Sequence, residues 1–148
     1  MNNYPAWWNA TITLYNKFVD KDTKRTEWYK HVIPNCYYSH VLDKVTVGRT
    51  TIESKNSICR IRVSDLFRDP KAWKELTEAD KHKYFTLGTG DIIVADEVAF
   101  EIDEYEQGAR SSDLKSEYKD WPGCFTIEYI GINVGGGRGN EHYLAKGV

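Results

Sequence analysis

The sequence has no long apolar run and few cysteines, and both absences narrow the class of protein. No stretch approaches the roughly 20 apolar residues that cross a bilayer, and the N-terminus lacks the basic segment and apolar stretch of a signal peptide. We therefore expect neither a membrane protein nor an exported one. The cysteines form an odd set without C-x-x-C spacing, which predicts reduced, mostly buried thiols in a cytosolic setting and no zinc site. They are Cys36, Cys59 and Cys124.

An excess of positive charge is also missing. Lys and Arg total 20 against 22 Asp and Glu, which gives a net charge of −2, and the two signs are interspersed along the chain. A protein that binds nucleic acid without regard to sequence normally has a basic excess. Such binding is disfavoured here, although a protein that only lets DNA pass needs no excess.

Recognisable catalytic motifs are absent as well. The glycine-rich loop Gly135–Asn140 lacks the lysine followed by serine or threonine of a phosphate-binding loop, so a hairpin loop or tail hinge is favoured. Four histidines lie on separate segments without metal-ligand spacing. The acidic cluster from Asp96 to Glu106 lacks the pattern of an EF-hand, and a solvated acidic edge is favoured. A Cys–His nucleophile pair stays open, because such partners meet in space. We predict no enzyme and no cofactor.

The composition indicates one globular domain over residues 1–148. Hydrophobic residues make up 41% and charged residues 28%, an ordinary globular mixture. The aromatic share is 14%, with 5 Trp and 10 Tyr, and broad rings pack well on pleated sheets. The sequence therefore predicts a mainly β fold, a small antiparallel β-barrel or sandwich with short inserted helices.

Alternating apolar and polar residues locate most of the strands. Cys59–Val63 alternates most clearly, with an apolar side and a cationic side that carries Arg60 and Arg62. Pro34-Asn35 is expected to interrupt the second strand, and a register change near 129–131 predicts a bulge. Strands are expected at 10–15, 27–33, 36–38, 44–47, 59–63, 92–94, 98–102 and 124–134, helices after Asp69, after Thr77 and at 112–118, and a short terminal segment at 142–148.

Both ends of the chain carry residues suited to contacts. Residues 1–8 form an aromatic N-terminal arm, and 135–148 form a glycine-rich loop and C-terminal tail. Adjacent tryptophans near a terminus need a surface to cover them. That surface is either the domain's own core, the slightly favoured alternative, or a neighbouring subunit, where Trp is a frequent anchor. The predicted interface residues are Trp7, Trp8, Arg138, Asn140, His142 and Tyr143.

Three segments together resemble a family of small structural proteins from the virion-assembly genes of tailed phages and prophages of Gram-positive bacteria. Two of them, 9–17 with the hairpin to 28–32 and the stretch 84–94 that contains Gly90-Asp91, resemble head–tail adaptor proteins of the head-closure or stopper type, and 132–134 followed by 137–143 resembles the C-terminal signature of the prophage family. The segments 64–83 and 108–121 have no counterpart in compact adaptors.

The resemblance implies a non-enzymatic structural protein of the virion. Such adaptors are small β-barrels that assemble in the host cytoplasm as a homo-oligomeric ring. The ring contacts portal-side connector proteins and tail-side proteins at the head–tail joint, and it retains packaged DNA without binding it specifically. Alternatives are a tail terminator or minor capsid protein and, from another class, a ligand-binding or hydrolytic β-barrel.

The acidic residues are then expected at the rim or lumen of the ring. Gly90 permits a tight turn, and the carboxylates after it carry more charge than a buried contact tolerates. An acidic lumen would repel DNA phosphates and let the genome slide. The predicted lumen or rim residues are Asp91, Asp103, Glu104 and Glu106.

Overall fold

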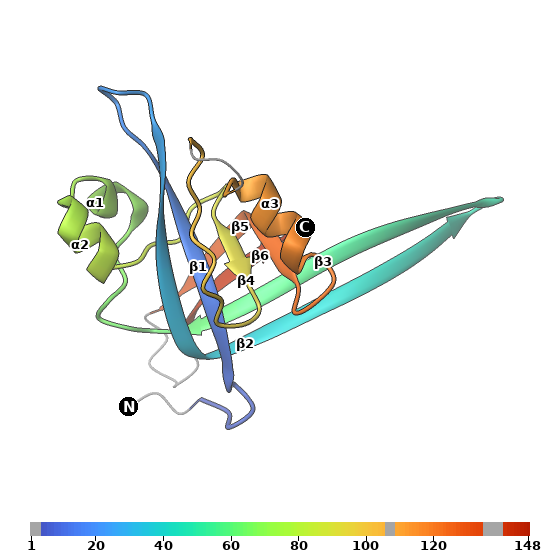
Figure 1. The fold of residues 1–148 in the computed structure, drawn as a ribbon. Helices are drawn as coiled ribbons and strands as arrows, with labels where there is room; N and C mark the ends of the chain where they lie inside the picture. Colours follow the sequence, from blue (N-terminus) through green and yellow to red (C-terminus); the bar gives the residue numbers. More distant parts are fainter. Residues whose placement is uncertain (1–3, 106–108, 135–140) are drawn as a thin grey trace.

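Six strands form one closed antiparallel barrel in the computed structural model, which describes residues 4–105, 109–134 and 141–148 (Figure 1). At 41–45 and 52–55 it describes the backbone alone. The order around the barrel is β1-β2-β3-β6-β5-β4, and β4 closes on β1. This confirms the predicted mainly β fold and selects the barrel. The strands are β1 Ala10–Val19, β2 Thr26–Val47, β3 Thr50–Arg62, β4 Ile92–Val94, β5 Cys124–Asn133 and β6 His142–Gly147.

The core follows the alternation of the sequence. Ile12 and Leu14 of β1 point into the barrel with Cys59 and Ile61 of β3. A second apolar cluster lies outside β1 and β4, where Tyr15 packs with residues of the connection that follows β4 and of α3 (Ser111–Tyr118). β1 is therefore buried on both faces.

β2 is one long strand where the sequence predicted three. Pro34-Asn35 does not end it, because Asn35 adopts a left-handed conformation with φ 58° and the ladder with β1 shifts register there. This irregularity bends the strand, so its first part pairs with β1 and its second part with β3.

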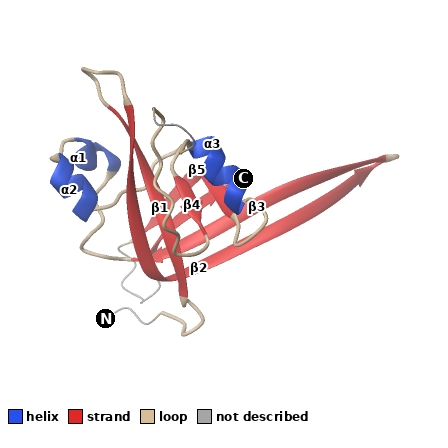
Figure 2. Cartoon of the chain, viewed as in Figure 1, coloured by secondary structure: helices blue, strands red, loops and turns tan. Residues whose placement is uncertain are grey.

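The short helices lie where capping residues predicted them (Figure 2). Asp69 caps α1 (Pro70–Lys74) by accepting a hydrogen bond of 2.9 Å from the Ala72 N–H. Thr77 caps α2 (Glu78–Lys83) by accepting one from Asp80. α3 begins one residue earlier than expected, and its N-cap is Arg110 where the sequence indicated a capping serine.

Two predictions about strands need correction. Residues 98–102, where a strand was expected, belong to no strand of the structure. Conversely, the terminal segment is a full strand, because β6 pairs with both β3 and β5. The predicted bulge in β5 is confirmed, with a register shift between Ile127 and Tyr129.

Candidate assembly surface

A two-stranded ribbon leaves the barrel and projects away from it (Figure 1). It consists of residues 41–47 of β2 and 50–56 of β3, from the pair Val41–Asn56 to the pair Val47–Thr50. β6 pairs with β3 only from Ser57 onward, so these segments pair with one another alone among the described strands. At roughly 3.3 Å per residue the ribbon extends about 23 Å.

The sequence contains a turn signal for the ribbon at Gly48-Arg49, from which only the strand before the turn was predicted. Gly48-Arg49 separates two β-type segments by two residues, and Gly48 has φ 64°, while Arg49 has no positive φ. This matches the II′ hairpin turn, in which glycine occupies the first central position. The sequence predicted a strand at 44–47 before Gly48. It did not indicate how far the two strands continue without other partners.

The N-terminal arm packs on the outside of its own barrel. Trp8 is buried, with its ring 5.7 Å from the His142 ring of β6 and 6.3 Å from the Tyr37 ring of β2. The Tyr4 hydroxyl donates to the Glu141 carbonyl at 2.6 Å and accepts from the Val63 N–H at 3.0 Å. The covering surface for Trp8 is therefore the chain's own barrel.

Trp7 differs from its neighbour because 63% of its surface is exposed. Its ring lies 5.3 Å from the ring of Tyr37, edge to face. The structure thus brings three predicted interface residues together, Trp7, Trp8 and His142. Tyr143 points the other way, into the core, and stacks on Phe67 at 4.1 Å. Arg138 and Asn140 lie outside the described residues.

Beside the N-terminal arm, the outward side chains of β3, β6 and β5 form what we call the cationic face. Alternation places Arg60 and Arg62 outward on β3, because Cys59 and Ile61 point inward. Lys146 of β6 lies opposite Ile58 of β3, diagonal to Arg60, and opposite Tyr129 of β5. The predicted cationic side of the third strand thereby becomes part of a wider surface.

Cation–π contacts hold the cations of this face in place. The Arg60 guanidinium lies 5.3 Å from the centre of the Tyr37 ring, and the Lys146 Nζ lies 5.8 Å from that of Tyr129. Arg62 is held more firmly, since it donates to the Trp8 carbonyl at 3.0 Å and lies over Tyr4.

The opposite side of the barrel is covered by residues 95–105, which we call the acidic segment. Thr13 of β1 anchors it, because its hydroxyl donates to the Asp96 carbonyl at 2.7 Å and accepts from the Val98 N–H. The Tyr15 hydroxyl donates to the Phe100 carbonyl at 2.7 Å. Side chains of β1 hold the acidic segment, and the backbone of β1 does not. This explains why the expected strand is absent.

Every second residue of the acidic segment packs inward: Val98, Phe100 and Ile102. Glu97, Glu101 and Asp103 occupy the positions that alternate with them, and Asp96 and Glu104 stand at the two ends of the run. Asp103 is half-buried and accepts from the Tyr105 N–H, while Glu104 accepts from the Trp28 indole at 3.0 Å and from the Ser111 N–H. Glu104 therefore holds the segment to the barrel and to α3. Glu106 lies outside the described residues.

Asp91 does not face a surface. It is 3% exposed, and its carboxylate accepts hydrogen bonds from the Asn16 amide, the Lys17 N–H and the Gly88 N–H, at 2.8 to 2.9 Å. Asn16 also donates to the Thr86 carbonyl. Burial raises the pKa of Asp91 to about 6, although the three donors act to lower it. The prediction that Asp91 lies at a rim or lumen is therefore wrong. Its buried carboxylate links β1 to the turn before β4.

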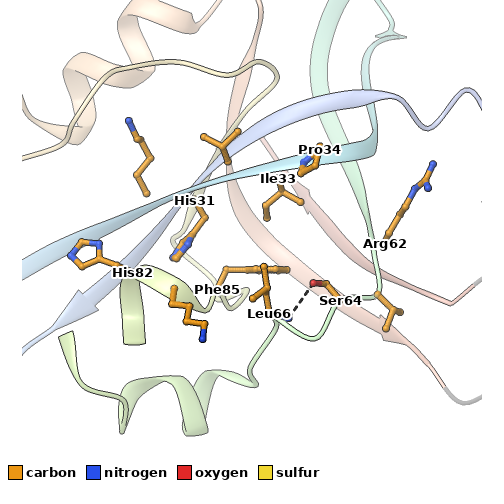
Figure 3. Close-up of a pocket in the computed structure, with 12 residues that line it drawn as sticks. His31, Ile33, Pro34, Arg62, Ser64, Leu66, His82 and Phe85 are labelled. Carbon is orange, nitrogen blue, oxygen red and sulfur yellow. Dashed lines mark hydrogen bonds between the residues drawn. The ribbon is translucent and has the colours of Figure 1, made fainter. Parts of the chain in front are cut away.

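One pocket of about 480 Å³ opens between β2, the segment after β3 and the end of α2 (Figure 3). Each of its cations already has a partner within the chain. Lys30 pairs with Glu101 at 2.8 Å, and Lys83 lies over the Tyr84 ring. The Ser64 hydroxyl accepts from the Leu66 N–H. The pocket therefore offers mainly apolar surface, with lining residues that include His31, Ile33, Pro34, Leu66 and Phe85.

His31 is the buried titratable group of this pocket. Burial foremost, and the nearby His82, lower its pKa to about 4, so the ring is neutral at neutral pH. Its Nε2 atom has no hydrogen-bond partner among the described residues.

The described residues contain no cluster of three or more His, Cys, Asp or Glu side chains that could hold a metal ion. Cys36 and Cys59 are buried free thiols and Cys124 is a half-buried one, as the sequence predicted. In the described part of the chain no helix is long and apolar enough to cross a membrane.

Comparison with known proteins identifies a family but no characterised relative. No curated protein and no solved structure matches the chain. One family model, described as a family of unknown function (DUF6751), matches residues 7–148. This match includes every strand and helix described above, and we conclude that the chain belongs to the DUF6751 family.

Proposed function

We propose that this protein is a non-enzymatic structural subunit of a phage or prophage virion, assembled as a ring at the head–tail joint. In this role it joins the connector to the tail and retains packaged DNA as a head-closure, or stopper, adaptor. The resemblance of the opening hairpin and of the Gly90-Asp91 stretch to such adaptors supports the proposal.

The projecting ribbon is the observation that carries the proposal. A two-stranded hairpin alone is marginally stable in water, and its outer edges leave unpaired N–H and C=O groups. The ribbon pairs with no other described strand, so the isolated chain gains little from extending it. A neighbouring subunit or an adjacent ring would cover these edges. A projecting arm is therefore expected of an assembly protein and has no use in a solitary barrel.

The barrel itself suits a repeated subunit. Its sheet closes through β4, which pairs with both β1 and β5, so the barrel presents less free strand edge than an open sheet. Trp7 adds an exposed aromatic side chain on a surface ordered by its neighbours. In the pocket beside His31, Lys30 and the Ser64 hydroxyl already have partners within the chain, so neither is free to act in a hydrolytic site.

The position in the particle can be tested by immunogold electron microscopy of virions from the phage or prophage that encodes the chain. We expect label at the head–tail joint. Label over the capsid would favour a minor capsid protein, and absence of the protein from particles would refute a structural role.

The ribbon can be tested in the same system. Replacing 42–55 by Asn-Gly retains the pair Val41–Asn56 and closes it with a favoured hairpin turn. We expect this variant to yield separate heads and tails. Lys71→Glu with Lys74→Glu, on the exposed surface of α1, is the matched control and should leave infectivity unchanged.

A further inference from the structure

We propose that the ring forms head to tail, with the cationic face of one subunit docked on the acidic segment of a second copy of this chain. The inference rests on the proposed ring and specifies its interface. It also places the acidic segment in the contact between subunits, and no longer at the lumen that the sequence predicted.

Among the described side chains, the cationic face carries more positive than negative charge. The outward surface of β3, β5 and β6, from Ser57 onward, carries three cations against one carboxylate, Glu128 at the bulge. Among the described residues, neither Arg60 nor Lys146 forms an ion pair; both make ring contacts instead. These cations are therefore available to a partner that supplies carboxylates.

The acidic segment has the opposite composition. It carries five carboxylates and no lysine or arginine. Asp96 and Glu97 are exposed, and the Glu101 side chain is 74% exposed although it pairs with Lys30. The small Ala99 lies between them, so another chain can approach closely. The inward packing of the alternate residues holds this charge in a fixed geometry.

The two surfaces lie on opposite sides of the barrel. In the closed order β1-β2-β3-β6-β5-β4, β6 stands across from β1 and β3 across from β4. The acidic segment covers β1 and β4, while the cationic face belongs mainly to β3 and β6. In Figure 1 the segment passes in front of the barrel and β6 lies behind it.

Opposed surfaces of opposite charge favour a second copy as the occupant. A heterologous contact between them repeats from subunit to subunit and closes into a ring when each step includes a suitable rotation. A two-fold contact through either surface would instead bring like charges together, which costs affinity.

Aromatic side chains supply the apolar part of this contact. Trp7 and Tyr129 are 63% and 57% exposed, and they flank the cations of the cationic face. Interfaces are enriched in aromatic residues and arginine, and Trp is a common anchor. A face that combines cations with exposed aromatic side chains fits a folded protein partner better than a partner that offers charge alone.

Charge reversal on each surface tests the pairing in the full chain. The first variant is Arg60→Glu with Lys146→Glu, and the second is Asp96→Lys with Glu97→Lys. Arg62 and Glu104 are left intact because they hold the fold. Lys71→Glu with Lys74→Glu makes the same charge change as the first variant, but on α1. Self-association is measured by sedimentation velocity at about 50 mM and about 500 mM salt, with the melting temperature as the check on folding.

We expect wild type and the α1 control to self-associate, more weakly at the higher salt. Each reversal variant should weaken self-association roughly tenfold or more. The chain with all four reversals should regain it, and so should an equimolar mixture of the two variants, because each then finds an opposite charge.

Wild-type self-association that neither reversal alters would overturn the proposed interface. So would a wild-type chain that stays monomeric at low salt, or duplex DNA binding that requires Arg60 and Lys146 while self-association does not. Immunogold label at the head–tail joint would still support the proposed function in any of these cases, so the two failures are distinguishable.

Discussion

The buried carboxylate of Asp91 and the buried imidazole of His31 predict two opposite effects of pH on stability. Burial raises the pKa of Asp91 from 3.8 to about 6 and lowers that of His31 from 6.5 to about 4. A raised folded-state pKa gives stability that is fully present below pH 3.8 and is lost as the pH rises through about 6. The lowered pKa gives stability that is present above pH 6.5 and is lost as the pH falls through about 4.

The two contributions are similar in size. Each pKa unit corresponds to about 1.4 kcal/mol, so each group changes the free energy of unfolding by about 3 kcal/mol across its window. Between pH 4 and 6 the two changes have opposite signs and largely cancel in the wild-type chain. The wild-type curve alone therefore hides both.

Two substitutions separate the effects. Asp91→Asn removes the titrating carboxyl but keeps an oxygen that accepts from the surrounding N–H groups, and His31→Gln removes the titrating ring. We compare free energies of unfolding between pH 4 and pH 7. Over this range the difference between wild type and Asp91→Asn should fall by about 3 kcal/mol, and the difference between wild type and His31→Gln should rise by about the same amount. Other titrating groups are common to all three chains, so the differences isolate each site.

Urea unfolding at several pH values measures these differences. A wild-type advantage over Asp91→Asn that grows as the pH rises would refute the reasoning for Asp91. It would mean that the donors from Asn16, Lys17 and Gly88 outweigh the cost of burying the charge.

Three further predictions concern packing and the ribbon. Gly147→Ala should destabilise the barrel by about 3 kcal/mol or more, because a Cβ there would overlap the backbone of β5; a melting temperature close to wild type would contradict this. Glu104→Lys should lower the melting temperature, since it leaves the Trp28 indole without its acceptor, whereas Glu97→Lys should not. Replacing 42–55 by Asn-Gly should change the melting temperature little, because the ribbon lies outside the core; a large drop would place it in the folding unit.

Local signals in the sequence predicted much of the fold. The alternation at Ile12 and Leu14, and again at Cys59 and Ile61, identifies the inward faces of β1 and β3 because burial of one face imposes a period of two. Asp69 and Thr77 mark helix starts because each can accept a hydrogen bond from the first turn. These features depend on neighbours within a few residues.

The acidic segment shows where such signals fail. Val98, Phe100 and Ile102 alternate as a strand would, and the alternation does predict which side chains are buried. It cannot tell whether a backbone ladder or side chains hold the segment. Here Thr13 and Tyr15, far away in the sequence, provide the hydrogen bonds. A period of two therefore reports a half-buried extended chain, and only tertiary contacts decide whether it is a strand.

Net charge said little about where the charges lie. A total of −2 argued against binding to polyanions, while the alternation at 59–63 and the acidic run from 96 to 106 predicted a cationic side and an acidic edge. The fold brings Arg60 beside β6, where Lys146 lies, and places the carboxylates of 95–105 across the barrel. A near-zero total thus coexists with two opposed charged faces. Since interactions between exposed charges decay over a Debye length of roughly 10 Å, a partner responds to the nearer face and not to the total. A nearly neutral chain can for this reason carry a strongly directional contact.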